Sequence, residues 1–165
     1  MKKAVWSGIL AAVGALALST PAFAQTTAAV TVNAQVNAKA RLTVSAAAIS
    51  FADEDPDSVA VIPANTPLDI TVKARTTAGG SVTLTVAADS NLISGSNSIG
   101  IGALKWSSTG TSFSGTGTSA LSAQTVVSFT GSGTRTGTQS YTLDNSWAYA
   151  TGTYGTTLNY TLSAP

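Results

Sequence analysis

The chain contains neither cysteine nor histidine among its 165 residues. Without cysteine there is no disulfide, no thiolate nucleophile and no lipidated cysteine, so the fold depends on its hydrophobic core. Without histidine, the commonest general base, the commonest transition-metal ligand and the Ser–His–Asp triad are absent. A catalyst would have to be built from carboxylates, as in glycoside hydrolysis. We therefore expect no enzymatic activity and no cofactor.

The first 24 residues have the pattern of a secretory signal peptide. A positively charged start at residues 1–3 is followed by an apolar run at 4–18 and an A-x-A cleavage site at 22–24. The apolar run is shorter than the roughly 20 residues that a transmembrane helix needs. We expect residues 1–24 to be removed. The mature chain, with no transmembrane segment, is expected to be secreted to the periplasm, the cell surface or the cell exterior.

Charged residues are also scarce, at 9% of the chain. Once Lys2 and Lys3 leave with the signal peptide, six Lys and Arg residues remain against seven Asp and Glu, and the net charge is near −1. Binding to nucleic acid depends on dense neutralisation of phosphates by Lys and Arg. A nearly neutral, sparsely charged chain predicts no nucleic-acid partner.

Apolar and polar residues alternate along most of the remaining chain, which is the pattern of β-strands with one buried face. The alternation runs unbroken through residues 30–44, and it returns at 68–75 and 82–88. The Gly-containing connection at residues 76–80 predicts that the last two strands form a hairpin. The polar phase of these strands carries four charged residues that we assign to a solvated sheet face: Lys39, Arg41, Lys73 and Arg75.

Shorter apolar runs predict further strands, and no segment of the mature chain shows helical periodicity. The runs are at residues 49–51, 59–62, 99–106, 125–130, 140–143 and 155–162. Strands at this spacing, separated by turn residues, are typical of antiparallel sandwiches and barrels. Because each strand carries few apolar residues, we predict an all-β fold, a single antiparallel immunoglobulin-like β-sandwich over residues 25–165. Its last strand is expected to bury Leu158, Tyr160 and Leu162.

The opening alternation is too long for one ordinary strand. At about 3.3 Å per residue, residues 30–44 extend on the order of 50 Å, whereas strands are usually about 5 to 6 residues long. One interpretation is a long first strand that pairs inside its own domain. The other is that residues 25–37 project as a donor strand for an open sheet edge of another subunit. The inserted side chains are then Val30, Val32, Ala34 and Val36.

An acidic loop follows the first predicted strands, with Asp53, Glu54, Asp55 and Asp57 close together. Clustered carboxylates supply the oxygen ligands that calcium prefers. The spacing differs from the EF-hand pattern and lacks the glycine of its sharp turn. Asp53, Asp55 and Asp57 are therefore a weak metal candidate, and a solvated acidic turn is the favoured interpretation.

Trp147 and Tyr149 are two positions apart in the sequence. In an extended segment they share a face, as a sugar-stacking platform requires. Packing in the core or at its rim is the commoner use of such aromatic residues. A glycan contact through Trp147 and Tyr149 is thus the alternative to packing.

The mature chain as a whole resembles small secreted bacterial β-sandwich proteins of the pilus-subunit and spore-coat-U type. Like them, it has an alternating N-terminal strand, Thr- and Gly-rich middle strands and a C-terminal strand with an aromatic residue, here Tyr160. Residues 158–165 are also similar to the distal motif of WxL cell-surface domains, with Tyr160 in place of Trp. Residues 104–106 are similar to the proximal motif, with Ser108 in place of Leu. These resemblances imply a surface structural protein, and the WxL motifs imply attachment to peptidoglycan.

Export, the missing catalytic groups and the long alternating segment lead to one expected function. We expect a secreted structural or cell-surface protein, a fibre, pilus or coat subunit that associates with itself or with other surface subunits by β-strand addition. The alternative is a carbohydrate- or cell-wall-binding module. That alternative predicts that Trp147 and Tyr149 are exposed and coplanar.

Overall fold

The structure is a computed structural model that describes residues 26–165. The signal peptide predicted for residues 1–24 lies outside the described residues. The chain divides into two units, of which the first ends at Ala34 and the second is Gln35–Pro165. In the first unit, residues 26–34 are exposed and contain neither helix nor strand.

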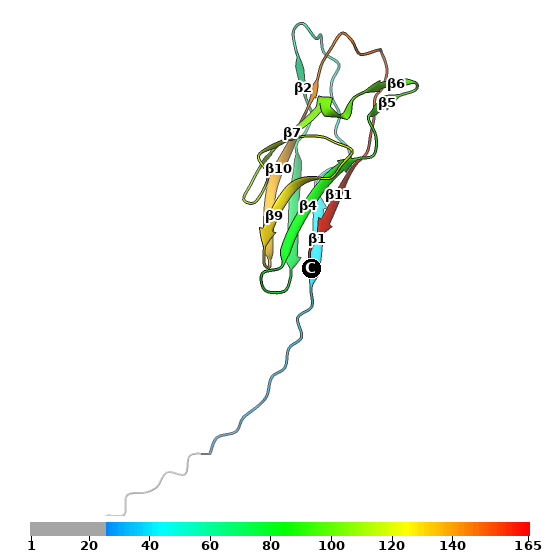
Figure 1. The fold of residues 1–165 in the computed structure, drawn as a ribbon. Helices are drawn as coiled ribbons and strands as arrows, with labels where there is room; N and C mark the ends of the chain where they lie inside the picture. Colours follow the sequence, from blue (N-terminus) through cyan, green and yellow to red (C-terminus); the bar gives the residue numbers. More distant parts are fainter. Residues whose placement is uncertain (1–25) are drawn as a thin grey trace, which may run out of the picture. The chain divides into compact units, whose positions relative to one another are not determined.

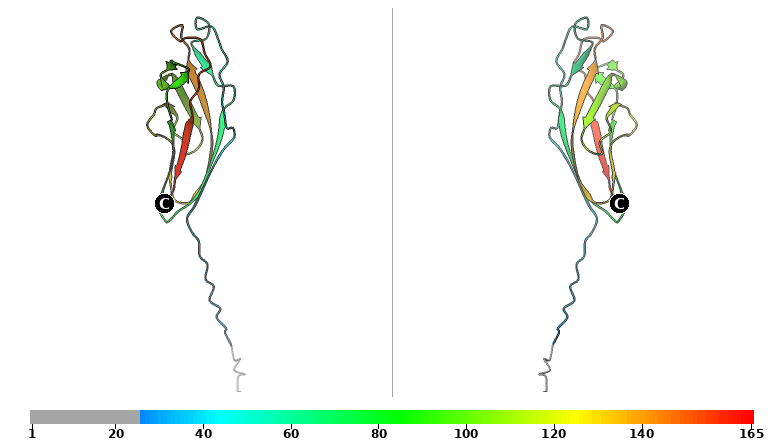
Figure 2. Two further views of the ribbon diagram at one scale, coloured as in Figure 1. Left: turned by 90° about the vertical axis from the view of Figure 1, so that its right-hand side faces the viewer. Right: turned by 90° about the vertical axis from the view of Figure 1, so that its left-hand side faces the viewer.

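Two antiparallel sheets make up the second unit (Figures 1 and 2). The larger sheet has the order β1 (Lys39–Val44), β3 (Leu68–Arg75), β10 (Gly133–Asp144), β7 (Leu104–Thr109) and β8 (Thr116–Thr118), and β2 (Val61–Pro63) pairs with β10. The smaller sheet has the order β11 (Leu158–Ser163), β4 (Ser81–Ala88) and β9 (Gln124–Thr130). A separate hairpin joins β5 (Leu92–Ser94) to β6 (Asn97–Ile99), and a short 3-10 helix follows at Ile101–Ala103.

The inward faces of the two sheets form the core. In the middle of the larger sheet, Ile70 and Val72 are fully buried, and Val82 and Leu84 are buried opposite them in the smaller sheet. Full burial of such a side chain contributes about 1.5–3 kcal/mol. Their sequence neighbours on the other phase, such as Lys73, face solvent. This arrangement confirms the predicted all-β fold of antiparallel sheets packed as a β-sandwich.

The hairpin predicted at residues 76–80 is wrong. β3 pairs with β1 and β10, whereas β4 pairs with β11 and β9, so this connection crosses from one sheet to the other. Gly79 has a φ of 76°, the left-handed conformation that glycine adopts without steric cost. The prediction failed because alternation identifies the buried face of each strand and not its partner.

Other boundaries also differ from the prediction. The first strand is limited to Lys39–Val44, and residues 26–38 belong to no strand, so the interpretation of one long strand paired inside its own domain is not observed. The strand predicted at 99–106 is divided by the 3-10 helix. β10 begins at Gly133, well before the predicted residue 140. Within residues 26–165, no helix is long and apolar enough to cross a membrane.

Candidate functional site

The two sheets leave a pair of edge strands next to each other. β1 lies at one end of the larger sheet and pairs only with β3, and β11 lies at one end of the smaller sheet and pairs only with β4. β1 and β11 are in contact (Figure 1), yet among the described residues no ladder joins them. Each therefore has one side of its backbone outside any ladder, which is the feature that allows a further strand to add.

The inward side chains of these edge strands are only half-buried. Leu42 and Val44 of β1 have this intermediate exposure, as do Leu158, Tyr160 and Leu162 of β11. The alternating phase of the last strand is as predicted, but its three large side chains are partly buried, where burial was expected. These residues pack against the core on one side only, because no strand covers the edge.

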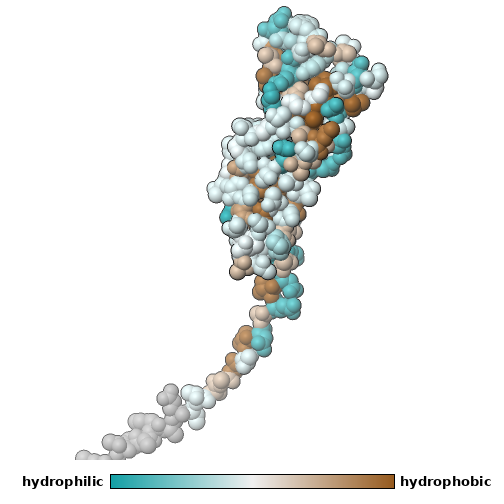
Figure 3. Space-filling model, in the orientation of Figure 1, coloured by the Kyte–Doolittle hydropathy of each residue, from teal (hydrophilic) through white to brown (hydrophobic). Residues whose placement is uncertain are grey.

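A groove with a mixed polar and apolar lining continues from this edge into the end of the sandwich. Its volume is about 1310 Å³, and its lining includes Val44, Ile49, Phe51, Leu158 and Tyr160, together with the acidic loop and Trp147. Figure 3 shows hydrophobic atoms exposed on this part of the domain, near β5, β6 and β11. We call the half-buried residues of β1 and β11 together with this hollow the edge groove.

A polar network lies beneath Tyr160 and connects the sheets. The Tyr160 hydroxyl donates to Gln139 Oε1 at 2.5 Å, and the Tyr141 hydroxyl lies 2.7 Å from the Tyr160 oxygen. Burial raises the pKa of Tyr160 to about 12, although its hydrogen bond with Tyr141 acts in the opposite direction. The pKa of Tyr141 is raised as well, mainly by burial and to a smaller extent by the nearby Tyr160. Both phenols therefore stay neutral at physiological pH.

The polar character of this network extends along the neighbouring strand pair. In the ladder of β10 and β7, Gln139 is opposite Ser108, and Tyr141 is opposite Trp106. The Gln139 Nε2, Ser108 Oγ and Trp106 Nε1 atoms are buried and have no hydrogen-bond partner among the described residues. A layer of polar groups thus crosses the core next to the edge groove.

Sequence reasoning missed Gln139 because the segment around it is rich in Thr, Ser and Gly. The alternation could nevertheless have indicated its burial, because Gln139 is two positions before the buried Tyr141 and so lies on the same inward face of β10. It also missed the groove wall in residues 46–52, where the predicted strand at 49–51 is reduced to one bridge between Phe51 and Ala64. No periodicity in so short a run could have indicated a groove.

The predicted donor residues are all exposed. Val30 and Val32 are each 86% exposed, Val36 is 67% exposed, and Ala34 between them is exposed as well. None of the four residues belongs to a strand. The described chain thus carries an alternating apolar segment without a ladder and, separately, an edge groove without a covering strand.

Trp147 and Tyr149 lie in a turn after β10, where the Tyr149 amide donates to the carbonyl of Ser146. The segment is therefore not extended, as the glycan-platform interpretation assumed. The spacing of Trp147 and Tyr149 then does not place them on one face. Trp147 is 70% exposed, and its Nε1 donates to Asp57 Oδ1 at 3.1 Å, whereas Tyr149 is half-buried. Burial of Trp147 in the core, one part of the favoured interpretation of packing in the core or at its rim, is wrong.

The carboxylates of the acidic loop do not converge. Asp53, Asp55 and Asp57 are exposed, the Asp55 carboxylate accepts the Asp57 amide, and Asp57 accepts the Trp147 indole. Among the described residues there is no group of three Asp or Glu side chains that could hold a metal ion. The weak metal candidate is not supported.

Comparisons of the chain with protein-family models, with curated proteins and with solved structures found no match.

Proposed function

We propose that this protein is a secreted structural subunit that associates with copies of itself by β-strand addition. Residues 26–37 of one copy add as a strand along the edge groove of the next. The observation that carries the proposal is a pair of complementary features in one chain. The segment exposes Val30, Val32 and Val36 on one phase, and the groove leaves apolar side chains half-buried between two unpaired strand edges.

The energetics favour such an addition. Main-chain hydrogen bonds to an open strand edge supply affinity, and alternate side chains that enter the groove supply specificity. Val30, Val32 and Val36 would pass from 67–86% exposure to burial, and full burial of a valine contributes about 1.5–3 kcal/mol. The odd positions of the segment, such as Thr31 and Asn33, then face solvent. Each copy has one donor segment and one groove, and a heterologous contact of this kind produces open filaments unless the rotation closes a ring.

Side-chain size suggests the register. Tyr160 is the one aromatic residue among the inward positions of β11, and Ala34 is the one small residue between Val32 and Val36. Placing Ala34 opposite Tyr160 avoids overpacking at that point. Antiparallel pairing with β11 is the commoner and slightly more stable geometry. It sets Val32 opposite Leu162 and Val36 opposite Leu158.

The test is a serine substitution series in the segment. V30S/V32S/V36S removes the inserted apolar groups, and the matched control T31S/N33S/Q35S changes the same number of residues on the polar phase. We expect the control to form the same filaments as the parent in electron microscopy and light scattering, and the first variant to remain a folded monomer. Deletion of residues 25–37 is expected to behave like the first variant. Filaments of unchanged amount from either altered protein would contradict the proposal.

A glycan- or cell-wall-binding module is the second candidate function, and the exposed indole of Trp147 favours it. The hydrogen bond to Asp57 holds the ring edge and leaves 70% of the residue exposed, as a sugar-stacking surface requires. Tyr149, by contrast, is half-buried. Titration with a panel of neutral polysaccharides and peptidoglycan tests this candidate. Tryptophan emission that shifts in the parent and not in W147A supports it, and emission that never shifts contradicts it.

A further inference from the structure

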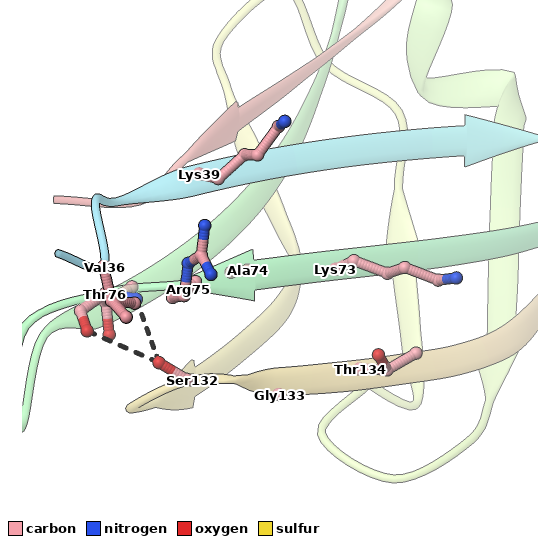
Figure 4. A pocket seen from close by; sticks show the side chains of 9 residues that line it. All are labelled: Val36, Lys39, Lys73, Ala74, Arg75, Thr76, Ser132, Gly133 and Thr134. Atoms are coloured by element: carbon pink, nitrogen blue, oxygen red, sulfur yellow. Dashed lines mark hydrogen bonds between the residues drawn. The ribbon is translucent and has the colours of Figure 1, made fainter. Parts of the chain in front are cut away.

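A second surface, on the outward side of β1 and β3, gathers positive charge. Lys39, Arg41, Lys73 and Arg75 are all exposed on the solvent side of β1 and β3, and they are four of the six cations in residues 26–165. In the ladder, Lys39 is directly opposite Arg75, and Arg41 is directly opposite Lys73. Adjacent strands lie about 4.8 Å apart, and residues on one face repeat about every 6.6 Å along a strand. We call this compact rectangle of four charges the basic face. Figure 4 shows Lys39, Lys73 and Arg75 on it.

The charges of the basic face are not neutralised by neighbouring acids. The one salt bridge among the described residues joins Lys105 to Asp144, outside this face. The acid that shares this side of β3 is Asp69, four residues from Lys73, and its carboxylate accepts a hydrogen bond from Thr138. Of the four basic side chains, only Arg75 makes a hydrogen bond in the described structure, from Nε to the carbonyl of Asn37.

Fold stability does not explain this arrangement. Like charges that lie directly opposite in an antiparallel pair are destabilising. Lys39 and Arg41 could protect an edge strand from unwanted pairing, but β3 is an interior strand with a partner on each side. Lys73 and Arg75 therefore complete a charged surface that neither packing nor edge protection requires.

The surroundings of the basic face indicate the chemistry of a ligand. Across the three neighbouring strands β1, β3 and β10, Arg41 pairs with Lys73, and Lys73 pairs with Thr134. Two residues further along the strands, the paired positions are all threonine: Thr43, Thr71 and Thr136. Cations and hydroxyl groups thus lie side by side on the outer surface of the sheet. The outward positions of β1, β3 and β10 carry no aromatic side chain. Single-stranded nucleic acids need aromatic platforms for base stacking, whereas an acidic sugar polymer needs cations for its acid groups and hydrogen-bond partners for its hydroxyl groups.

We propose that the basic face binds a linear anionic polysaccharide that carries carboxylate or sulfate groups. The four cations contact the acid groups, and the threonine hydroxyl groups contact the sugar hydroxyls. This site lies on the outer side of the sheet, and none of its four cations belongs to the half-buried residues of the edge groove.

The test measures binding of the full mature chain to immobilised polygalacturonate, with uncharged dextran as the control polymer. We expect K39Q/R41Q/K73Q/R75Q to bind at least about tenfold more weakly, because focused positive charge raises the local concentration of an anion by that order. The sharper comparison is between K73Q and K105Q, since each removes one positive charge. K73Q is expected to weaken binding, and K105Q to leave it unchanged. Thermal unfolding establishes that each variant is folded.

Three outcomes would overturn the proposal. These are equal weakening by K73Q and K105Q, equal binding to dextran and polygalacturonate, and tighter binding to single-stranded DNA of matched charge than to the polysaccharide. A parallel measurement with dextran sulfate distinguishes sulfate from carboxylate recognition. V30S/V32S/V36S is expected to keep the intrinsic affinity for polygalacturonate. The filament assay therefore tests strand addition, the binding assay tests the basic face, and either proposal can fail without the other.

Discussion

The Tyr160 hydroxyl donates a 2.5 Å hydrogen bond to the side-chain oxygen of Gln139, and this contact ties the edge strand of one sheet to the middle of the other. Tyr160 is half-buried in the wall of the edge groove, and Gln139 is fully buried. The bond therefore holds one wall of the groove at a defined position.

Y160F is expected to destabilise the protein by about 1–3 kcal/mol, because it leaves a buried amide oxygen and the Tyr141 hydroxyl without their partner. Urea unfolding followed by tryptophan fluorescence measures the difference in the free energy of unfolding. Y154F is the matched control, since it removes a hydroxyl that donates to the Ala150 carbonyl near the surface, and it is expected to change stability by less than about 0.5 kcal/mol. Equal effects of the two substitutions would contradict the role of the network.

The same pair makes stability depend on alkaline pH. The pKa of Tyr160 is raised from 10.0 to about 12 by burial, and that of Tyr141 is raised as well. A phenol that holds its proton more tightly in the folded state contributes stability that is fully present below pH 10 and is lost as pH rises through the folded pKa. The free energy of unfolding should therefore fall between pH 10 and 12. The fall should be smaller in Y141F/Y160F, and an identical pH dependence would contradict the assignment.

The proposed register can be tested by crosslinking, because the chain has no cysteine of its own. Directly opposite positions in an antiparallel pair have Cβ atoms about 4.5–5.5 Å apart, close to the range a disulfide needs. V32C/L162C is expected to give a ladder of disulfide-linked subunits on a non-reducing gel, whereas V32C/L158C is not. The reverse pattern would indicate the opposite strand direction. Filaments that form without any crosslink would contradict the proposed register. They would leave strand addition itself in place, because that proposal is tested separately by the serine substitutions in the donor segment.

Gly117 is a position where a small substitution should disturb the packing of a buried aromatic ring. It lies opposite Trp106 in the ladder of β7 and β8, and a methyl group at Gly117 would overlap the buried indole ring. We expect G117A to lower stability by about 1–3 kcal/mol through overpacking. G115A is the control, since a methyl group there meets no atom within 4 Å. A thermal midpoint for G117A equal to that of G115A would show that Trp106 has room to move.

Sequence reasoning succeeded where the relevant property is local. Strict alternation at residues 68–75 places Ile70 and Val72 inward and Lys73 outward, and the structure has them there. The same reasoning placed Leu158, Tyr160 and Leu162 on one face of the last strand, as observed. It failed for Trp147 and Tyr149, because their spacing implies a shared face only in an extended segment, and the chain forms a turn there.

The amino-acid sequence by itself determined the all-β class and which residues of each strand face inward, because period-two alternation is a property of neighbouring residues. Only the tertiary structure decided which strands pair. β3 and β4 carry the same pattern and are close in sequence, yet they belong to different sheets. It also decided that β1 and β11 are edges, which leaves Leu42 and Leu162 half-buried, and that four cations from two strands meet as the basic face. Strand partners depend on long-range packing of whole sheets, and no local repeat encodes them.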